Sequence, residues 1–339
     1  MSTLPISRLA SLAVVGLALA SCRGDATGTS GASVAPAPPG SFRAAFANSE
    51  WSEPVNLGPP INSPAQEQNP TLSNGGLSIY FVSNRTDLPG ALGANDIWVS
   101  RRACVDCPWE TPVNLGPVIN SSSGDAGPEL SVDGHLLFFT SSRPDELGST
   151  DNDLYVSRRA DPKDDFGWGH PVKLGADVNS TLSEFSPDFR ENAELGSANL
   201  YFQRGLAGGH PTNDLYYAAV TREGETRGPV RSAAELNDPT VADGSPTVGK
   251  DGREILFNSI RAGRLGTIDI WVSTRRSVHD PWSTPENLGP PVNIGGIPGV
   301  GTRDPDLSFD GRLLLFESNR PGGVGGNDLW MSTRPPSGK

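Results

Sequence analysis

The residues best suited to chemistry are acids that return at one position of a repeated phrase. Each stands three residues ahead of a proline that opens a short apolar segment; they are Glu67, Asp125, Glu184 and Asp243. The fifth copy has Thr302 there, followed by Arg303 and Asp304. A second set stands directly after the proline and reads Thr71, Glu129, Asp188, Thr247 and Asp306. Carboxylates gathered in this way could transfer protons or hold a cation.

These acids allow three interpretations. In the first, which we favour, each acid caps the turn of its own repeat, because nearly the same residue recurs in every copy. In the second, the acids bind a ligand or a hard cation such as Ca²⁺, which prefers clustered carboxylates. In the third, they form a glycosidase site, in which two carboxylates about 5 to 9 Å apart serve as acid and as nucleophile or base.

The three interpretations use different residues. A ligand site would use Glu67, Asp125, Glu184, Asp243, Arg303 and Asp304. An enzyme would use Asp125, Glu184 and Asp243, with Arg303 as a charged orienting group. Near-identical acids, however, offer no division of labour, which requires two different environments.

The phrase itself has a fixed period. Its copies begin at Trp51, Trp109, Trp168, Thr226 and Trp282, so their spacings are 58, 59, 58 and 56 residues. A period of this size indicates an array of one supersecondary unit. With 40 Gly and 31 Pro among 339 residues, the chain suits many short strands joined by tight turns.

Each unit predicts four short strands, and four-stranded units arranged in a ring are propeller blades. The repeats number five, so we predict an all-β, five-bladed β-propeller. The last unit lacks its fourth strand, and residues 51–57 are a spare copy of that strand. The N-terminal strand should therefore complete the last blade and remove an open edge. In such a ring the innermost strands line the channel, and the acids ahead of them surround one mouth.

The motif P-x-L-S-x-D-G-x-x-L-x-F-x-S-x-R, followed by N-D-[IL]-[WY]-V-S, resembles WD40-like (PD40) β-propeller repeats. These repeats are known from the periplasmic TolB propeller and from modules beside OmpA-like domains. The resemblance covers residues 51–335 and is specific for fold rather than function. TolB-type proteins have six blades and an extra N-terminal domain, whereas five blades are expected here. The 339 residues contain no OmpA-like segment, so we do not expect direct peptidoglycan binding.

Other repeated side chains are expected to be structural. The arginine after each second strand should pair with the aspartate that opens the third, locking that hairpin. The arginines are Arg85, Arg143, Arg204, Arg261 and Arg320, and the aspartates are Asp96, Asp153, Asp214, Asp269 and Asp328. The tryptophan of each phrase should cover the neighbouring apolar layer. The asparagines that end the phrase, Asn62, Asn120, Asn179, Asn237 and Asn293, should tie down the turn between blades.

The first residues read as a targeting segment. Arg8, an apolar run over 9–19 and the sequence LASC ending at Cys22 resemble the lipobox of bacterial lipoproteins. The resemblance implies cleavage before Cys22 and lipidation of that residue, and Arg23 favours the outer membrane. Residues 23–50 are small and polar and read as a flexible tether. The predicted divisions are a signal at 1–21, an anchor and tether at 22–50, the propeller at 51–335 and a tail at 336–339.

The cysteines and the net charge limit which metal sites and binding partners are expected. Cys104 and Cys107 form a C-x2-C pair, for which a structural disulfide is favoured in an oxidising compartment, ahead of free thiols. A zinc site needs about four ligands, and the four histidines are scattered, so no metal is expected there. A net charge of −12 makes nucleic acid a poor partner.

We therefore expect a monomeric, lipid-anchored envelope protein without intrinsic catalysis. It would bind another envelope protein or a glycan through the channel mouth or a blade rim. The alternative is a glycoside hydrolase, since five-bladed propellers include enzymes that act on furanosides and pentosides. Recognition would involve loops that break the repeat, which lie at 104–107, 190–197, His210 and 295–301.

Overall fold

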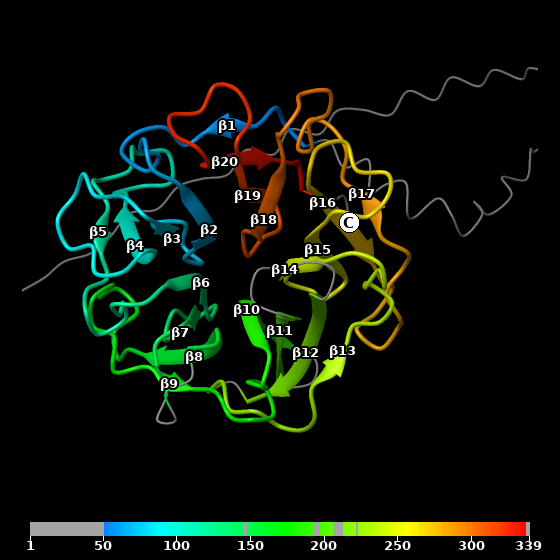
Figure 1. The fold of residues 1–339 in the computed structure, drawn as a ribbon, viewed down its shortest axis with the longest axis horizontal. Helices are drawn as coiled ribbons and strands as arrows, with labels where there is room; N and C mark the ends of the chain where they lie inside the picture. Colours follow the sequence, from blue (N-terminus) through cyan, green and yellow to red (C-terminus); the bar gives the residue numbers. More distant parts are fainter. Residues whose placement is uncertain are drawn as a thin grey trace, which may run out of the picture. The chain divides into compact units, whose positions relative to one another are not determined.

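The computed structural model describes residues 51–144, 148, 150–192, 197–205, 213–221 and 223–336. All regular structure in these residues is β-strand, in five four-stranded antiparallel sheets. The sheets stand around a central channel, with one innermost strand from each sheet facing it (Figure 1). The predicted five-bladed propeller is confirmed. The expected signal segment, Cys22, the tether to residue 50 and His210 lie outside the described residues.

The strands follow the sequence repeat, from the channel outward in each blade. The first blade contains β2 (Glu67–Leu72), β3 (Ser78–Ser83), β4 (Asp96–Arg101) and β5 (Val113–Asn114). The second contains β6 (Asp125–Leu130), β7 (Leu136–Ser141), β8 (Asp153–Arg158) and β9 (Val172–Lys173). The third contains β10 (Ser183–Asn192), β11 (Ser197–Gly205), β12 (Asp214–Val220) and β13 (Arg231–Ser232). The fourth contains β14 (Asp243–Val248), β15 (Glu254–Ser259), β16 (Asp269–Thr274) and β17 (Glu286–Asn287).

The fifth blade joins the two ends of the propeller. It contains β18 (Thr302–Leu307), β19 (Leu313–Ser318), β20 (Asp328–Thr333) and, at its outer edge, β1 (Val55–Asn56). In β1, Val55 pairs with Met331 and Asn56 with Trp330, antiparallel (Figure 1). The N-terminal strand thus closes the ring, as its spare copy of the outer strand predicts. Within the described residues no helix is long and apolar enough to cross a membrane.

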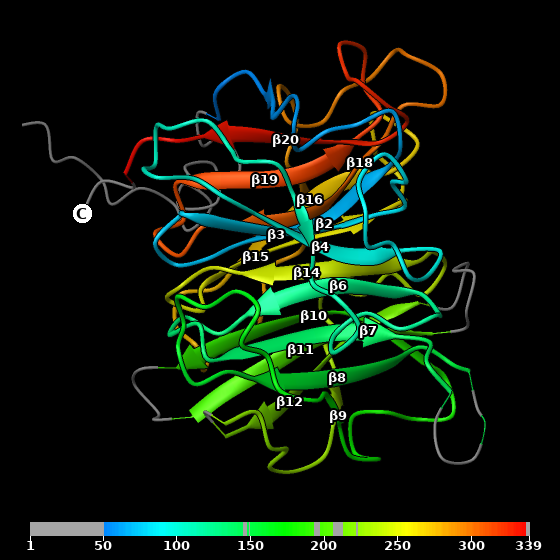
Figure 2. The same ribbon diagram turned by 90° about the vertical axis from the view of Figure 1, so that its left-hand side faces the viewer.

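The core consists of apolar layers between neighbouring blades. A phenylalanine at the same register position of every second strand is fully buried: Phe81, Phe139, Phe202, Phe257 and Phe316. Burying a side chain of this size stabilises the fold by about 1.5 to 3 kcal/mol. The blades therefore hold one another through repeated contacts, seen edge-on as stacked strands in Figure 2.

The side chains of the asparagines that end the phrases hydrogen-bond to the backbone of the third strands, as a neighbouring strand would. In Asn120, the side-chain oxygen accepts from the N–H of Ile97 at 2.8 Å, and the amide donates to the carbonyl of Ile97 at 2.9 Å. Asn62, Asn179, Asn237 and Asn293 make the same pair of bonds with Leu329, Leu154, Leu215 and Ile270. Each asparagine thus fixes the turn that leads to the next blade, which confirms that expectation.

The phrase tryptophans stack on a second series of arginines, at the ends of the third strands. Arg102, Arg159, Arg275 and Arg334 lie over Trp109, Trp168, Trp282 and Trp51, with 4.1 to 4.6 Å between guanidinium carbon and ring centre. Each arginine Nε also donates to a glycine carbonyl of the inner hairpin, at 2.6 to 2.7 Å. The tryptophans therefore make cation–π contacts with these arginines in addition to packing against the apolar layer.

Candidate active site

We call Glu67, Asp125, Glu184 and Asp243 the entry acids, and each is the first or second residue of an innermost strand. All four are fully buried, and each accepts hydrogen bonds from its own inter-blade turn. Asp125, for example, accepts from the N–H of Ser121 at 2.6 Å and from its hydroxyl at 2.9 Å. Glu67 and Glu184 are bound in the same way by Ser63 and Ser180. This geometry matches the capping interpretation and leaves little free lone-pair capacity for a substrate.

The arginines after the second strands pair with the entry acids. Arg143 is 2.8 Å from Asp125, and Arg204 is 2.8 Å from Glu184. Arg85 and Arg261 pair with Glu67 and Asp243, and Arg320 donates to Thr302 in the fifth blade. The predicted pairing with the third-strand aspartates is wrong for these arginines. Asp96, Asp269 and Asp328 instead accept N–H groups from the Gly-rich loop before them.

If the entry acids are structural, Asp243→Ala should be strongly destabilising. It would leave the Arg261 guanidinium, which is 10% exposed, without its carboxylate. Breaking such a buried pair costs about 3 to 5 kcal/mol, which urea denaturation would measure. The control is Asp251→Ala, which breaks an exposed pair with Arg253 and should cost less than about 1 kcal/mol. Equal costs for the two variants would contradict the capping role.

A second group of acids lies further along the same strands, inside the channel. We call Glu129, Asp188 and Asp306 the channel acids; they follow the prolines of β6, β10 and β18, and Thr71 and Thr247 hold that place in the other blades. Every innermost strand has a β-bulge directly before these positions. There the residue preceding the proline has positive φ; these residues are Asn69, Gly127, Ser186, Ser245 and Asp304. The bulge turns consecutive positions toward the channel, three in each of four blades and two in the first.

Arg190, at the far end of β10, organises two of the channel acids. Its guanidinium is 2.8 Å from Asp188 and 3.1 Å from Glu129, and it donates to the carbonyl of Val248 at 2.5 Å. Glu129 also accepts the hydroxyl of Thr71 at 3.1 Å. The described residues provide no cation within ion-pair distance of Asp306. The three acids therefore have different environments, in contrast to the entry acids.

Burial raises the pKa values of the three channel acids above those of ordinary carboxyls. Desolvation raises the pKa of Asp188 to about 6, although the Arg190 charge lowers it. Desolvation and the Asp188 charge raise the pKa of Asp306 to about 7, with Arg190 again opposing. Burial raises the pKa of Glu129 well above its usual value. Carboxyls whose pKa values lie near neutrality are suited to proton transfer.

The predicted residues Arg303 and Asp304 lie beside a buried carboxyl that the sequence reading did not single out. Arg303 is 2.7 Å from Glu317 on β19, and Asp304 lines the channel and accepts the hydroxyl of Ser245 at 2.6 Å. Burial and the neighbouring Asp304 carboxylate raise the pKa of Glu317 well above its usual value. The corresponding positions on the other second strands are Val82, Thr140, Gln203 and Asn258. That departure from the repeat is the signal that could have identified Glu317.

The channel space among these residues is narrow. Its volume is about 30 Å³, with the channel acids and Asp304 in its wall. A space of this size holds about one water molecule. Among the described residues no group of three or more His, Cys, Asp or Glu side chains is arranged to hold a metal ion. The channel therefore offers carboxyl groups and room for one water, and a sugar would have to lie at its mouth.

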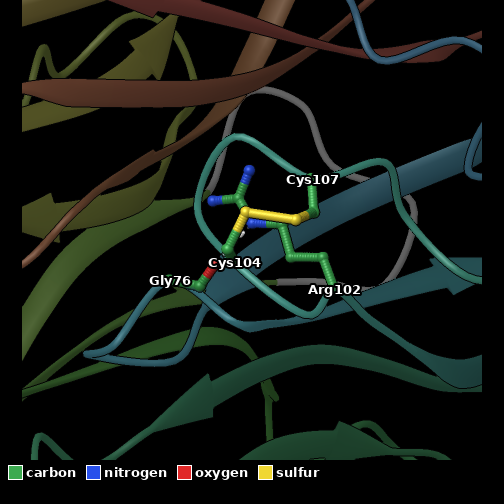
Figure 3. Close-up of a disulfide and its surroundings, with 4 residues drawn as sticks. All are labelled: Gly76, Arg102, Cys104 and Cys107. Carbon is green, nitrogen blue, oxygen red and sulfur yellow. Dashed lines mark hydrogen bonds between the residues drawn. A yellow bond between two sulfur atoms is a disulfide. The ribbon is translucent and has the colours of Figure 1, made fainter.

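The Cys104–Cys107 loop lies outside the channel. The two sulfurs are joined as a disulfide beside Arg102, whose Nε donates to the carbonyl of Gly76 at 2.6 Å (Figure 3). The loop follows β4, and Arg102 stacks on Trp109. Its contacts are with the first blade's own hairpin, and no channel acid contacts it.

No protein-family model and no curated protein sequence matches the chain. Among solved structures, the GH43 endo-arabinanase of Bacillus licheniformis matches with a TM-score of 0.55 at 12% identity, over 81% of this chain and 95% of its own. The α-L-arabinofuranosidase PaAbf62A of Podospora anserina matches with 0.53 at 13%, over 85% and 98%. TolB of Acinetobacter baumannii matches with 0.45 at 14%, over 81% and 56%. At these identities the likeness shows the fold.

The comparison corrects the expectation of a binding module without catalysis. Two propellers that this chain matches over nearly their whole length, the endo-arabinanase and the arabinofuranosidase, are glycoside hydrolases. That is the class held as the alternative in the sequence analysis. The expectation rested on the near-identity of the entry acids and on the regular PD40-like repeat.

Proposed function

We propose that this protein is a glycoside hydrolase that acts on pentose-containing glycans through the channel acids. The observation that supports it is the unequal environment of Asp188 and Asp306: Asp188 forms an ion pair with Arg190, whereas Asp306 has no cation within ion-pair distance among the described residues. The similarity to arabinan- and arabinofuranoside-cleaving propellers supports the substrate class. The entry acids would position the innermost strands and take no part in the reaction.

The two aspartates would divide the work. Asp188, whose ionised form Arg190 stabilises, would be the base. Asp306, whose pKa lies higher, would be protonated and would donate to the leaving-group oxygen. Space for one water in the channel favours direct attack by that water, which inverts the anomeric carbon. Glu129 would take no direct part in the reaction and would hold Arg190 in place through its ion pair.

A substrate screen tests the proposal. The chain should release the aryl group from α-L-arabinofuranosides or β-D-xylosides, or shorten arabinan, and Asp188→Asn should lower turnover by at least about a hundredfold. Glu110→Gln, an exposed acid on the outside of the first blade, is the matched control and should leave turnover unchanged. Absence of turnover on all pentosides, or full turnover in Asp188→Asn, would contradict the proposal.

The pH dependence of kcat/KM should be bell-shaped, with its maximum between about 6 and about 7. Activity should rise as Asp188 ionises above its pKa of about 6 and fall as Asp306 loses its proton above about 7. Because the two groups interact, the limbs report the pair rather than single residues. Initial rates at low substrate across the pH range provide the test. A flat profile from about pH 5 to about pH 9 would contradict these roles.

We also propose that the enzyme acts in the bacterial envelope, attached by lipid at Cys22. The support is the lipobox-like sequence and the small-residue segment that follows it. A glycan substrate fits this location, and the propeller would act as a monomer. Labelling of the full chain with a fatty acid, and its loss in Cys22→Ser, would test the anchor.

A further inference from the structure

The third-strand arginines meet different partners at different blade interfaces. Between the first and second blades, Arg159 is 2.8 Å from Asp165, which also accepts the hydroxyl of Tyr80 at 2.6 Å. Between the fourth and fifth blades, both terminal nitrogens of Arg334 bind the carboxylate of Glu254, at 2.8 and 2.5 Å. A bidentate pair of this kind is the strongest way to satisfy a guanidinium. In both interfaces the protein supplies the carboxylate itself.

The interface between the third and fourth blades lacks that carboxylate. Like its equivalents, Arg275 stacks on Trp282 and donates to a glycine carbonyl, that of Gly252, at 2.6 Å. It also contacts Tyr201. The register position that Glu254 holds on β15 is held by Asn199 on β11. No carboxylate in the described residues pairs with Arg275. The space is open instead, as a cavity of about 540 Å³ that Arg275, Asn199 and Tyr201 line.

The cavity is strongly basic in a protein whose net charge is −12. Arg190, Lys250, Arg253 and Arg276 line it together with Arg275, and Glu191 and Asp251 are its acids. Asp251 is already paired with Arg253. Arg276 is exposed and makes no ion pair or hydrogen bond within the described part of the chain. Among the described residues, Arg275, Arg276 and Lys250, which lies over the Phe309 ring, therefore have no carboxylate partner.

A cavity of this volume lies in the range of small-molecule sites. We propose that it binds the carboxylate of an acidic sugar, a uronate residue of a glycan, with Arg275 and Arg276 as the cationic partners. Asn199 and Tyr201 would hydrogen-bond the sugar hydroxyls. The choice of a sugar rests on the proposed function, whereas the carboxylate rests on the missing equivalent of Glu254. The ligand carboxylate would occupy the place that Glu254 fills at the next interface.

Calorimetric titration of the full chain with D-galacturonate tests the site without any turnover. Galacturonate should bind at least about tenfold more tightly than D-galactose, since a charge-assisted contact is lost with the neutral sugar. Asn199→Glu should supply the carboxylate from the chain, as Glu254 does for Arg334. It should weaken galacturonate binding at least about tenfold while the variant remains folded. Thr111→Glu, an exposed position on the outside of the first blade, adds the same charge and should leave binding unchanged.

Three results would overturn the proposal: no binding of galacturonate, equal binding of galactose, or undiminished binding by Asn199→Glu. Propionate binding as tightly as galacturonate would overturn the assignment to a sugar. A chain that binds galacturonate and hydrolyses no pentoside would overturn the proposed function and support this site. Failure of the site and failure of the function are therefore separate observations.

Discussion

Asp306→Asn should abolish most activity and at the same time stabilise the protein. The substitution removes the proposed proton donor, which should lower kcat/KM by at least about a hundredfold. It also removes a fully buried carboxyl whose pKa is raised to about 7 by desolvation and by the Asp188 charge. Ionising such a group opposes folding, because the unfolded chain ionises it more easily. The loss of function and the gain in stability would then come from the same buried group.

The size of the stability gain depends on pH. A carboxyl whose pKa is higher in the folded state makes stability fall as pH rises from its unfolded pKa toward its folded one. The gain in Asp306→Asn should therefore be small near pH 4, grow up to about pH 7 and then stay level, at on the order of 4 kcal/mol. Urea denaturation at several pH values would measure it. Asp310→Asn, an exposed acid on the adjoining turn, is the control and should change neither quantity. A variant that is less stable above about pH 7, or that keeps its turnover, would contradict the assignment.

Removal of residues 51–57 should open the ring. Without β1, the edge of β20 loses its pairing with Val55 and Asn56, and Asp328 loses the 2.8 Å bond from Asn56. Trp51, which is 6% exposed and lies over Arg334, would also be lost from the apolar layer of the last two blades. The loss of a buried tryptophan alone costs about 3 to 5 kcal/mol. We expect a fall in melting temperature of about 10 °C or more, with association through the exposed edge.

A rearranged chain provides the control for that truncation. Moving 51–57 behind residue 336 through a short linker should restore stability, because the closing strand needs only to reach β20. Ser52 already bonds to Thr333 across the closure, so the new connection is short. The measurements are thermal unfolding and molecular mass in solution. A truncated chain that is monomeric and as stable as the parent would show that closure does not depend on β1.

Much of the fold was predictable because the repeat constrains it five times over. The period, the D-G turns and the spare outer strand each follow from local chemistry, and the asparagine bonds to the third strand recur in all blades. The arginine after each second strand was recognised as structural, but its partner was not. The third-strand aspartate is the nearer of the two carboxylates along the chain, and only the packing of β6 against β7 places Arg143 beside Asp125.

For the candidate site too, the positions of the acids along the chain could be predicted from the sequence, whereas their contacts with other blades could not. The sequence by itself predicted that both sets of acids would meet at the channel; the channel acids do, whereas the entry acids cap their own turns. It could not rank Asp125 against Asp188, because they differ in neighbours that come from other strands and other blades. Arg190 lies beside Glu129 of another blade, and Asn199 lies where the next interface has Glu254. Burial and cross-blade contact, which raise the pKa of Asp306 and leave Arg275 without a carboxylate, exist only once the ring has closed.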